Sequence, residues 1–282
     1  MIYAINTLLW SDTVDENLIP VLEEIHALGY TGVEFPLFAP DIRKCERLGK
    51  VAKELGLSVT TCTCRGELEN PASPDEAIRR HGIAVNKQMI DCSVALGSRI
   101  LIGPYHTAIG YFTGKSVSSD EWQRTAESMR ETAEYAAQNG IYMALECVNR
   151  FETYFINCIA DGLKFIRTVD HPHYKLMFDT FHANIEEKSL AEAIRLAATD
   201  GNLIHVHISE NDRSTPGAGN IRWKEVFATL QEVGYSGTLC IEAFGASLPK
   251  IAAATKIWRK MYDTETQLIT DGLRFMQSWE NF

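Results

Sequence analysis

Short apolar segments rich in β-branched and aromatic residues alternate along the chain with longer segments whose apolar residues recur every three or four positions. The short segments have the length of buried strands, and the longer ones have the period of amphipathic helices. Eight strands are predicted, over residues 2–5, 32–35, 57–62, 99–103, 142–147, 175–179, 203–208 and 238–244. Helices are predicted between them, among others over residues 16–28, 74–96, 118–139 and 221–233.

Glycine recurs just before the predicted strands, at Gly29, Gly56, Gly97, Gly140 and Gly234. A glycine in this place typically forms the left-handed cap that ends a helix and turns the chain back. One such unit nearly repeats, because "ALGYTGVEF" (27–35) and "EVGYSGTLCIEAF" (232–244) both run from a helix through a glycine turn into a strand that contains glutamate.

Strands that alternate with helices indicate a parallel sheet. Eight such units in a chain of 282 residues predict a (β/α)₈ TIM barrel of the α/β class, as a single domain over residues 1–282. The alternative is a doubly wound open sheet, but the glycine fingerprint of that fold is absent after the first strand.

The composition excludes some classes of partner. The chain has 37 acidic and 27 basic residues and a formal charge of -10, so it has no general attraction for nucleic acid or anionic lipid. No apolar run approaches the roughly 20 residues of a membrane span. The first residues lack the basic region and cleavage site of a signal peptide. The seven scattered cysteines are typical of reduced thiols, and a cytoplasmic location is therefore expected.

Four of the predicted strands end in residue types that bind metals. In a barrel of this kind, functional groups lie at the carboxyl ends of the strands. The fifth to eighth strands end in this way in Glu146, Asp179, His207 and Glu242. Three carboxylates and one imidazole suit a hard or borderline divalent cation. Each residue alone has a structural explanation, such as a turn cap for Asp179, but the four equivalent positions together predict a metal site.

The segment "HVHISENDR" (205–213) offers two histidines to this site. Alternation places His205 and His207 on the same face of their strand, toward the barrel interior. His205 is about 6.6 Å further from the rim, two residues at about 3.3 Å each. His207 is therefore the predicted ligand, and His205 a supporting residue beneath it.

The polar residues after these strand ends lie on loops of the same face, where substrates are bound. Among them, Glu152 follows Glu146 by six positions, His182 follows Asp179 by three, and Arg213 follows His207 by six. A functional role is favoured for these three loop residues.

The motifs "ALECVNRFE", "FDTFHANIEE", "HVHISENDR", "PGAGNIRW", "IEAF" and "WRKM" resemble those of the ketose 3-epimerase family, within the sugar isomerase/epimerase barrels. This family includes the D-tagatose, D-allulose (psicose) and L-ribulose 3-epimerases. The resemblance is strong from about residue 141 to 260, and "VNRFE" and "DTFHANIEE" are its most specific motifs. The chain departs from the family at "ISE" and "EAF", which leaves the identity of the sugar open.

The resemblance implies a role for each candidate residue. A divalent cation, manganese first and magnesium or cobalt as alternatives, would be held by Glu146, Asp179, His207 and Glu242. The two glutamates would also be the catalytic acid/base pair, which inverts C3 of a free ketose through a cis-enediolate. The substrate would be held by Glu152, His182 and Arg213. The family also implies a homodimer or homotetramer.

Other activities remain open on the same residues. The first is aldose–ketose isomerisation, and the second is a lyase that acts on 3-keto-glycosides. A metal-dependent endonuclease acting on abasic DNA would need more ligands and a basic surface. A non-catalytic sugar-binding barrel would not need the full metal set with both glutamates.

Overall fold

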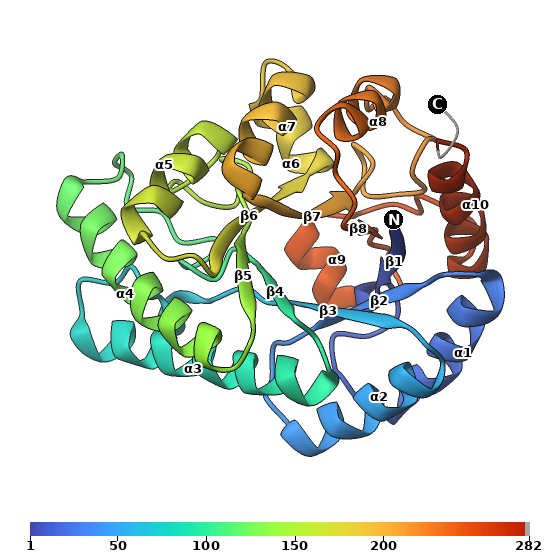
Figure 1. Cartoon of the computed structure of the whole chain (residues 1–282), viewed down its shortest axis with the longest axis horizontal. Coiled ribbons are helices and arrows are strands. Elements are labelled where there is room, and N and C mark those ends of the chain that lie inside the picture. Colours follow the sequence, from blue (N-terminus) through green and yellow to red (C-terminus); the bar gives the residue numbers. More distant parts are fainter. Residues whose placement is uncertain (280–282) are drawn as a thin grey trace.

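The computed structural model describes residues 1–279, and these form a closed barrel of eight parallel strands surrounded by helices (Figure 1). The strands pair in chain order, and β1 closes the barrel against β8. They are β1 (Ile2–Asn6), β2 (Gly32–Pro36), β3 (Ser58–Cys62), β4 (Ile100–Gly103), β5 (Tyr142–Leu145), β6 (Tyr174–Asp179), β7 (Leu203–Ile208) and β8 (Thr238–Ile241). The predicted TIM barrel is confirmed, and each of the eight predicted strands overlaps an observed one.

Ten α-helices lie within the described residues. They are α1 (Ile19–Leu28), α2 (Ile42–Glu54), α3 (Glu76–Leu96), α4 (Ser119–Gln138), α5 (Ile159–Val169), α6 (Thr180–Glu186), α7 (Leu190–Ala198), α8 (Trp223–Glu232), α9 (Pro249–Thr255) and α10 (Glu265–Gln277). The helix predicted over residues 16–28 is instead a 3-10 turn followed by α1, because Pro20 stands in the first turn of α1 and cannot donate a backbone hydrogen bond. No helix in residues 1–279 is long and apolar enough to cross a membrane.

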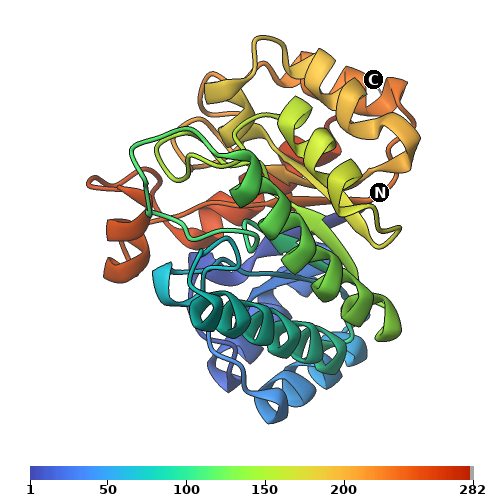
Figure 2. The ribbon, with the colours of Figure 1, turned by 90° about the vertical axis from the view of Figure 1, so that its left-hand side faces the viewer.

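The carboxyl ends of the strands form one mouth of the barrel. Seen from the side, α9 and the long loop after β4 extend from the same end of the molecule (Figure 2). In the view of Figure 1, α9 lies across the barrel opening. This short helix therefore covers part of the mouth where the predicted site residues lie.

The glycine that ends β4 is required by its backbone. Gly103 has φ +124°, and a Cβ there would collide with the carbonyl oxygen of Thr63 on the neighbouring segment. Its own carbonyl accepts a hydrogen bond of 3.2 Å from the backbone nitrogen of Glu146. Gly103 therefore lets the backbone pass close to β3 and at the same time supports Glu146.

Gly103→Ala is expected to lower the free energy of unfolding by about 1–3 kcal/mol, because alanine strains this backbone conformation. Urea unfolding followed by circular dichroism measures the change. Gly66→Ala is the matched control, since a Cβ at Gly66 meets nothing within 4 Å and no left-handed φ is needed. Equal stability of the Gly103 variant and the wild type would contradict the strain argument.

Candidate active site

Four metal-type side chains meet at the carboxyl end of the barrel. Glu146, Asp179, His207 and Glu242 each place one ligand atom within 4.8 Å of the others, and all four are buried. Asp179 ends β6 and His207 lies in β7, whereas Glu146 and Glu242 follow the last residues of β5 and β8 by one position. The structure thus brings the predicted set together, although two of its members lie just beyond their strands.

His207 uses its two ring nitrogens differently. Nε2 lies 2.8 Å from Oε1 of Glu34, whereas Nδ1 lies 3.4 Å from Asp179 Oδ2 and 3.5 Å from Glu242 Oε2 without a hydrogen bond. Burial opposes a charged ring, but Glu34 and Glu242 raise the pKa of His207 well above its usual value. Nδ1 is therefore the nitrogen that faces the carboxylate cluster.

Glu34 on β2 is the main residue that sequence reasoning missed. This fully buried carboxylate accepts hydrogen bonds from Asn6 Nδ2 and Thr60 Oγ1, both of 2.9 Å, and contacts His205 Nε2 at 3.0 Å. Burial would raise the pKa of Glu34, but His207 and His205 hold it below its usual range. The near-repeat of the sequence contained a signal for this residue, since both of its strands carry a glutamate, Glu34 two positions and Glu242 five positions after the second glycine of the turn.

Asp179 caps a helix and also faces the cluster, so its position is compatible with both roles that the sequence left open. Its Oδ1 caps α6 by accepting hydrogen bonds from the backbone nitrogens of Phe181 (2.7 Å) and His182 (3.1 Å). Its Oδ2 faces the cluster and accepts from Arg213 Nη1 at 3.1 Å. Burial raises the pKa of Asp179, but Arg213 and His182 bring it well below the usual value. The helix cap thus holds the carboxylate in the orientation that the cluster uses.

Arg213 is a buried residue that lines the cavity and donates hydrogen bonds to two members of the cluster. Besides Asp179, its guanidinium donates to Glu242 Oε2 at 2.6 Å, and its carbon lies 3.9 Å from the ring centre of Phe181 and 5.1 Å from that of Phe244. Its backbone has φ +63°, an uncommon conformation for a residue with a side chain. The buried guanidinium therefore neutralises part of the negative charge of the three carboxylates.

The loop that carries Arg213 is organised by Glu210. This fully buried carboxylate accepts hydrogen bonds from the backbone nitrogens of Gly217 (2.8 Å) and Ile221 (3.1 Å) and from Nε1 of Trp223 (2.9 Å). Glu210 is consequently a support of this loop and does not line the cavity beside the cluster.

His182 and Glu152 lie on the other side of Glu146. The backbone nitrogen of Asn149 lies 3.1 Å from His182 Nδ1, and Glu146 Oε1 lies 3.4 Å from His182 Nε2. Burial lowers the pKa of His182 to about 4, so the ring is neutral at pH 7. Asn149 also donates to Glu152 Oε1 at 2.9 Å, and it is a second residue that sequence reasoning missed.

Glu146 has the least compensated charge of the cluster. Burial, together with the neighbouring Glu242 and Asp179, raises the pKa of its carboxyl well above the usual value. A buried carboxyl among other carboxylates holds its proton unless a cation replaces it.

A cavity of about 180 Å³ joins these residues to the barrel mouth. Its lining includes five of the candidate residues, namely Glu146, Glu152, His182, Arg213 and Glu242. Apolar and thiol side chains line the rest, among them Leu8, Phe38, Cys64, Phe244 and Ile251. A larger hollow of about 730 Å³ lies between residues 214–218 and 260–275, and none of the predicted site residues lines it. The predicted site residues therefore belong to the smaller cavity.

The donor set fits a divalent cation. Three carboxylates converge with an imidazole nitrogen that has no hydrogen-bond partner, and oxygen-rich sets with one imidazole suit manganese and magnesium. Nε2 of His207 is bonded to Glu34, and a carboxylate in this position commonly orients a histidine ligand. The four residues could therefore hold a metal ion, and a cavity lies beside them.

Known proteins resemble this chain along nearly its whole length. Residues 22–279 match the model of the xylose isomerase-like TIM barrel family. The D-psicose 3-epimerase of Ruminiclostridium cellulolyticum is 32% identical over 280 residues, which cover 95% of this chain and 94% of that protein.

Solved structures show the same likeness. The structure of an L-ribulose 3-epimerase superposes with a TM-score of 0.93 at 30% identity, covering 100% of this chain and 95% of the other. A D-allulose 3-epimerase from Methylomonas sp. in complex with D-allulose gives a TM-score of 0.91 at 28% identity, covering 99% and 96%.

Proposed function

The chain belongs to the xylose isomerase-like TIM barrel family and, within it, to the ketose 3-epimerases, and from this premise we propose that it inverts C3 of a free ketose with the help of a bound divalent cation. Its relatives are epimerases, so the enzyme is an isomerase. The observation that carries the proposal is the pair Glu146 and Glu242, which share one cluster and line one cavity.

The two glutamates would exchange the proton at C3. They follow β5 and β8, which are separated by β6 and β7 in the barrel, and can therefore approach a sugar from two sides. One glutamate removes the C3 proton from one face, and the other returns a proton to the opposite face, so that the configuration is inverted. Because the reaction is reversible, each glutamate serves as acid in one direction and as base in the other.

Glu146, Asp179, His207 and Glu242 would hold the cation. A bound divalent cation would supply positive charge that polarises the C2 carbonyl, and this would make the C3 proton more acidic and favour the cis-enediolate. Manganese is the metal we propose, with magnesium and cobalt as alternatives, because carboxylate oxygens form most of the set.

The remaining pocket residues would bind and orient the sugar. Glu152 and the neutral ring of His182 lie beside Glu146 and would hold the C1–C2 end. Arg213 would donate to the substrate oxygens while it keeps Asp179 and Glu242 in place. The apolar wall favours a free sugar over a phosphorylated one. We also propose, from the family resemblance, a cytoplasmic homodimer or homotetramer.

Incubation with D-fructose, D-tagatose and L-ribulose tests the reaction itself. We expect each ketose that the enzyme accepts to yield its C3 epimer, resolved by chromatography, and we expect no product in the presence of a chelator. An aldose product would indicate aldose–ketose isomerisation instead. Cleavage of a 3-keto-glycoside without ketose epimerisation would favour the lyase alternative.

Metal binding is expected to release protons and to tighten as pH rises. Glu146 and His207 have raised pKa values in the metal-free protein, so protons compete with the cation at low pH and leave as pH increases. Isothermal titration calorimetry with manganese, repeated in buffers of different ionisation enthalpy, counts the released protons. An affinity that is independent of pH between 5 and 8 would contradict the proposed ligands.

A further inference from the structure

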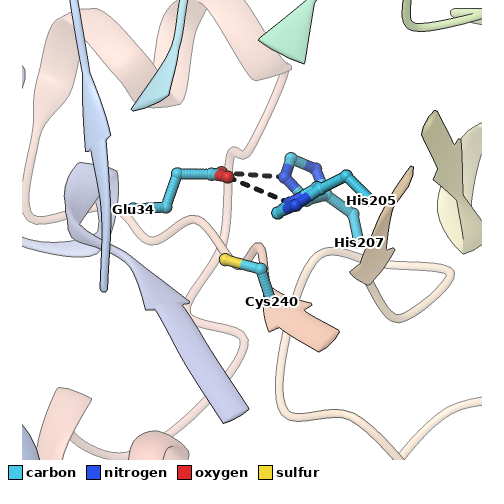
Figure 3. A group of neighbouring side chains, drawn as sticks. All are labelled: Glu34, His205, His207 and Cys240. Carbon is cyan, nitrogen blue, oxygen red and sulfur yellow. Dashed lines mark hydrogen bonds and ion pairs between the residues drawn. The ribbon is translucent and has the colours of Figure 1, made fainter. Parts of the chain in front are cut away.

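A second group of side chains that could bind a metal lies inside the barrel. It is beneath Glu146, Asp179, His207 and Glu242, which are called the rim cluster below. Glu34, His205, His207 and Cys240 each offer one ligand atom within 4.8 Å of the others, and all four are buried. Figure 3 shows the carboxylate of Glu34 pointing from β2 at both imidazoles of β7, with the thiol of Cys240 on β8 beside them. Cys240 precedes Glu242 by two residues, about 6.6 Å along the strand. The proposed epimerisation uses His207 but gives His205 and Cys240 no part.

His205 and Cys240 are buried side chains whose hydrogen bonding is incomplete or weak. Nδ1 of His205 has no hydrogen-bond partner, whereas Nε2 lies 3.0 Å from Glu34 Oε2, and the ring is fully buried. The thiol of Cys240 lies 3.7 Å from the backbone oxygen of Ile241 and also interacts with the carboxylate of Glu34. An unsatisfied buried polar group costs about 1–3 kcal/mol, so groups of this kind call for a physical explanation.

The inner group differs in chemistry from the rim cluster. One thiol, two imidazoles and one carboxylate favour a borderline ion of the zinc class, whereas three carboxylates and one imidazole favour manganese or magnesium. Glu34 already accepts hydrogen bonds from Asn6 and Thr60, which would hold it in place as a ligand. We propose that Glu34, His205, His207 and Cys240 form a second, inner site for a thiophilic divalent cation.

His207 links the two sites. Its Nδ1 faces the rim cluster, and its Nε2 faces Glu34 and the inner group. Binding of the inner ion releases the thiol proton of Cys240 and the Nε2 proton of His207 to water, and no electrons are transferred. An ion in the inner site would lie between Glu34 and Nε2 of His207, while Nδ1 of the same ring still faces the rim cluster.

Cobalt(II) titration of the metal-free full-length protein tests this site without any sugar. Thiolate ligation of cobalt gives a near-ultraviolet charge-transfer absorption that an oxygen and nitrogen site does not give. We expect two cobalt ions per chain by elemental analysis, with this absorption in the wild type. Cys240→Ser is expected to lose the absorption and to retain one cobalt.

Cys62→Ser is the matched control, because Cys62 is also buried in the barrel interior but is outside the inner group. The absorption should persist in this variant; its loss there and retention in Cys240→Ser would overturn the assignment. His205→Gln should weaken binding of the second cobalt by about 10-fold or more. If the Cys240 variant does not fold, the cobalt content and the absorption of the wild type still test the proposal.

A single cobalt per chain without charge-transfer absorption would refute the inner site. This result is independent of catalysis, since the titration contains no ketose. Conversely, a failure to form a C3-epimeric product would leave the cobalt measurement unaffected.

Discussion

Replacement of Glu146 or Glu242 by glutamine is expected to lower the turnover number for C3 epimerisation by about 10³-fold or more while the barrel stays folded. Glutamine has nearly the same shape but cannot exchange a proton, and general acid–base catalysis commonly contributes 10²–10⁴-fold. Each variant also loses a proposed metal ligand, which adds to the effect. Steady-state rates on the ketose accepted by the wild type, with the metal content measured in each sample, provide the test.

Glu186→Gln is the matched control for these two variants. Glu186 lies at the end of α6, pairs with Arg150 at 2.6 Å and does not line the cavity, so its loss should leave the rate nearly unchanged. Circular dichroism and the melting temperature show whether each variant is folded. Full activity of either catalytic variant with its metal bound would exclude the two-glutamate mechanism.

Glu34→Gln is expected to weaken metal binding at the rim by about 10- to 100-fold, the range found when a carboxylate that orients a metal-binding histidine is removed. The carboxylate accepts a hydrogen bond from His207 Nε2, which leaves Nδ1 free to bind the cation. The amide of glutamine can turn its NH₂ group toward Nε2 of His207. It then no longer stabilises the form of the ring that carries its proton on Nε2. The affinity for manganese and the rate as a function of manganese concentration are the quantities to measure.

Saturating manganese should restore most of the turnover number of Glu34→Gln, because Glu34 acts through His207 and does not touch the sugar. Glu187→Gln is the control, since Glu187 is a partly buried glutamate that accepts a hydrogen bond from the backbone of Ile159 at 2.7 Å, away from the cluster. Unchanged manganese affinity in Glu34→Gln would show that Glu34 does not orient His207.

Local patterns in the sequence predicted much of the fold. Strand composition, helix period and glycine caps are properties of neighbouring residues, and they placed all eight strands of the observed barrel. They were less accurate at the ends of elements, as the 3-10 turn before α1 and the positions of Glu146 and Glu242 just beyond β5 and β8 illustrate.

Local patterns in the sequence also predicted the rim cluster. Equivalent ends of parallel strands lie at one edge of a barrel, so Glu146, Asp179, His207 and Glu242 could be grouped without coordinates. Strand alternation and depth also separated His207 from His205. The roles of these residues in catalysis and metal binding remain proposals.

The contacts across the barrel interior were decided only by the tertiary structure. Glu34 and His207 are 173 residues apart in sequence, and they meet because barrel closure turns β2 and β7 toward the same interior space. Arg213 appeared from its loop position to be a substrate contact, yet the fold also places it against Asp179 and Glu242. The alternation of residues along a strand predicts which face of the strand each residue occupies. Only the closed barrel determines which side chains from other strands share that face, and therefore which nitrogen of His207 is left for a metal.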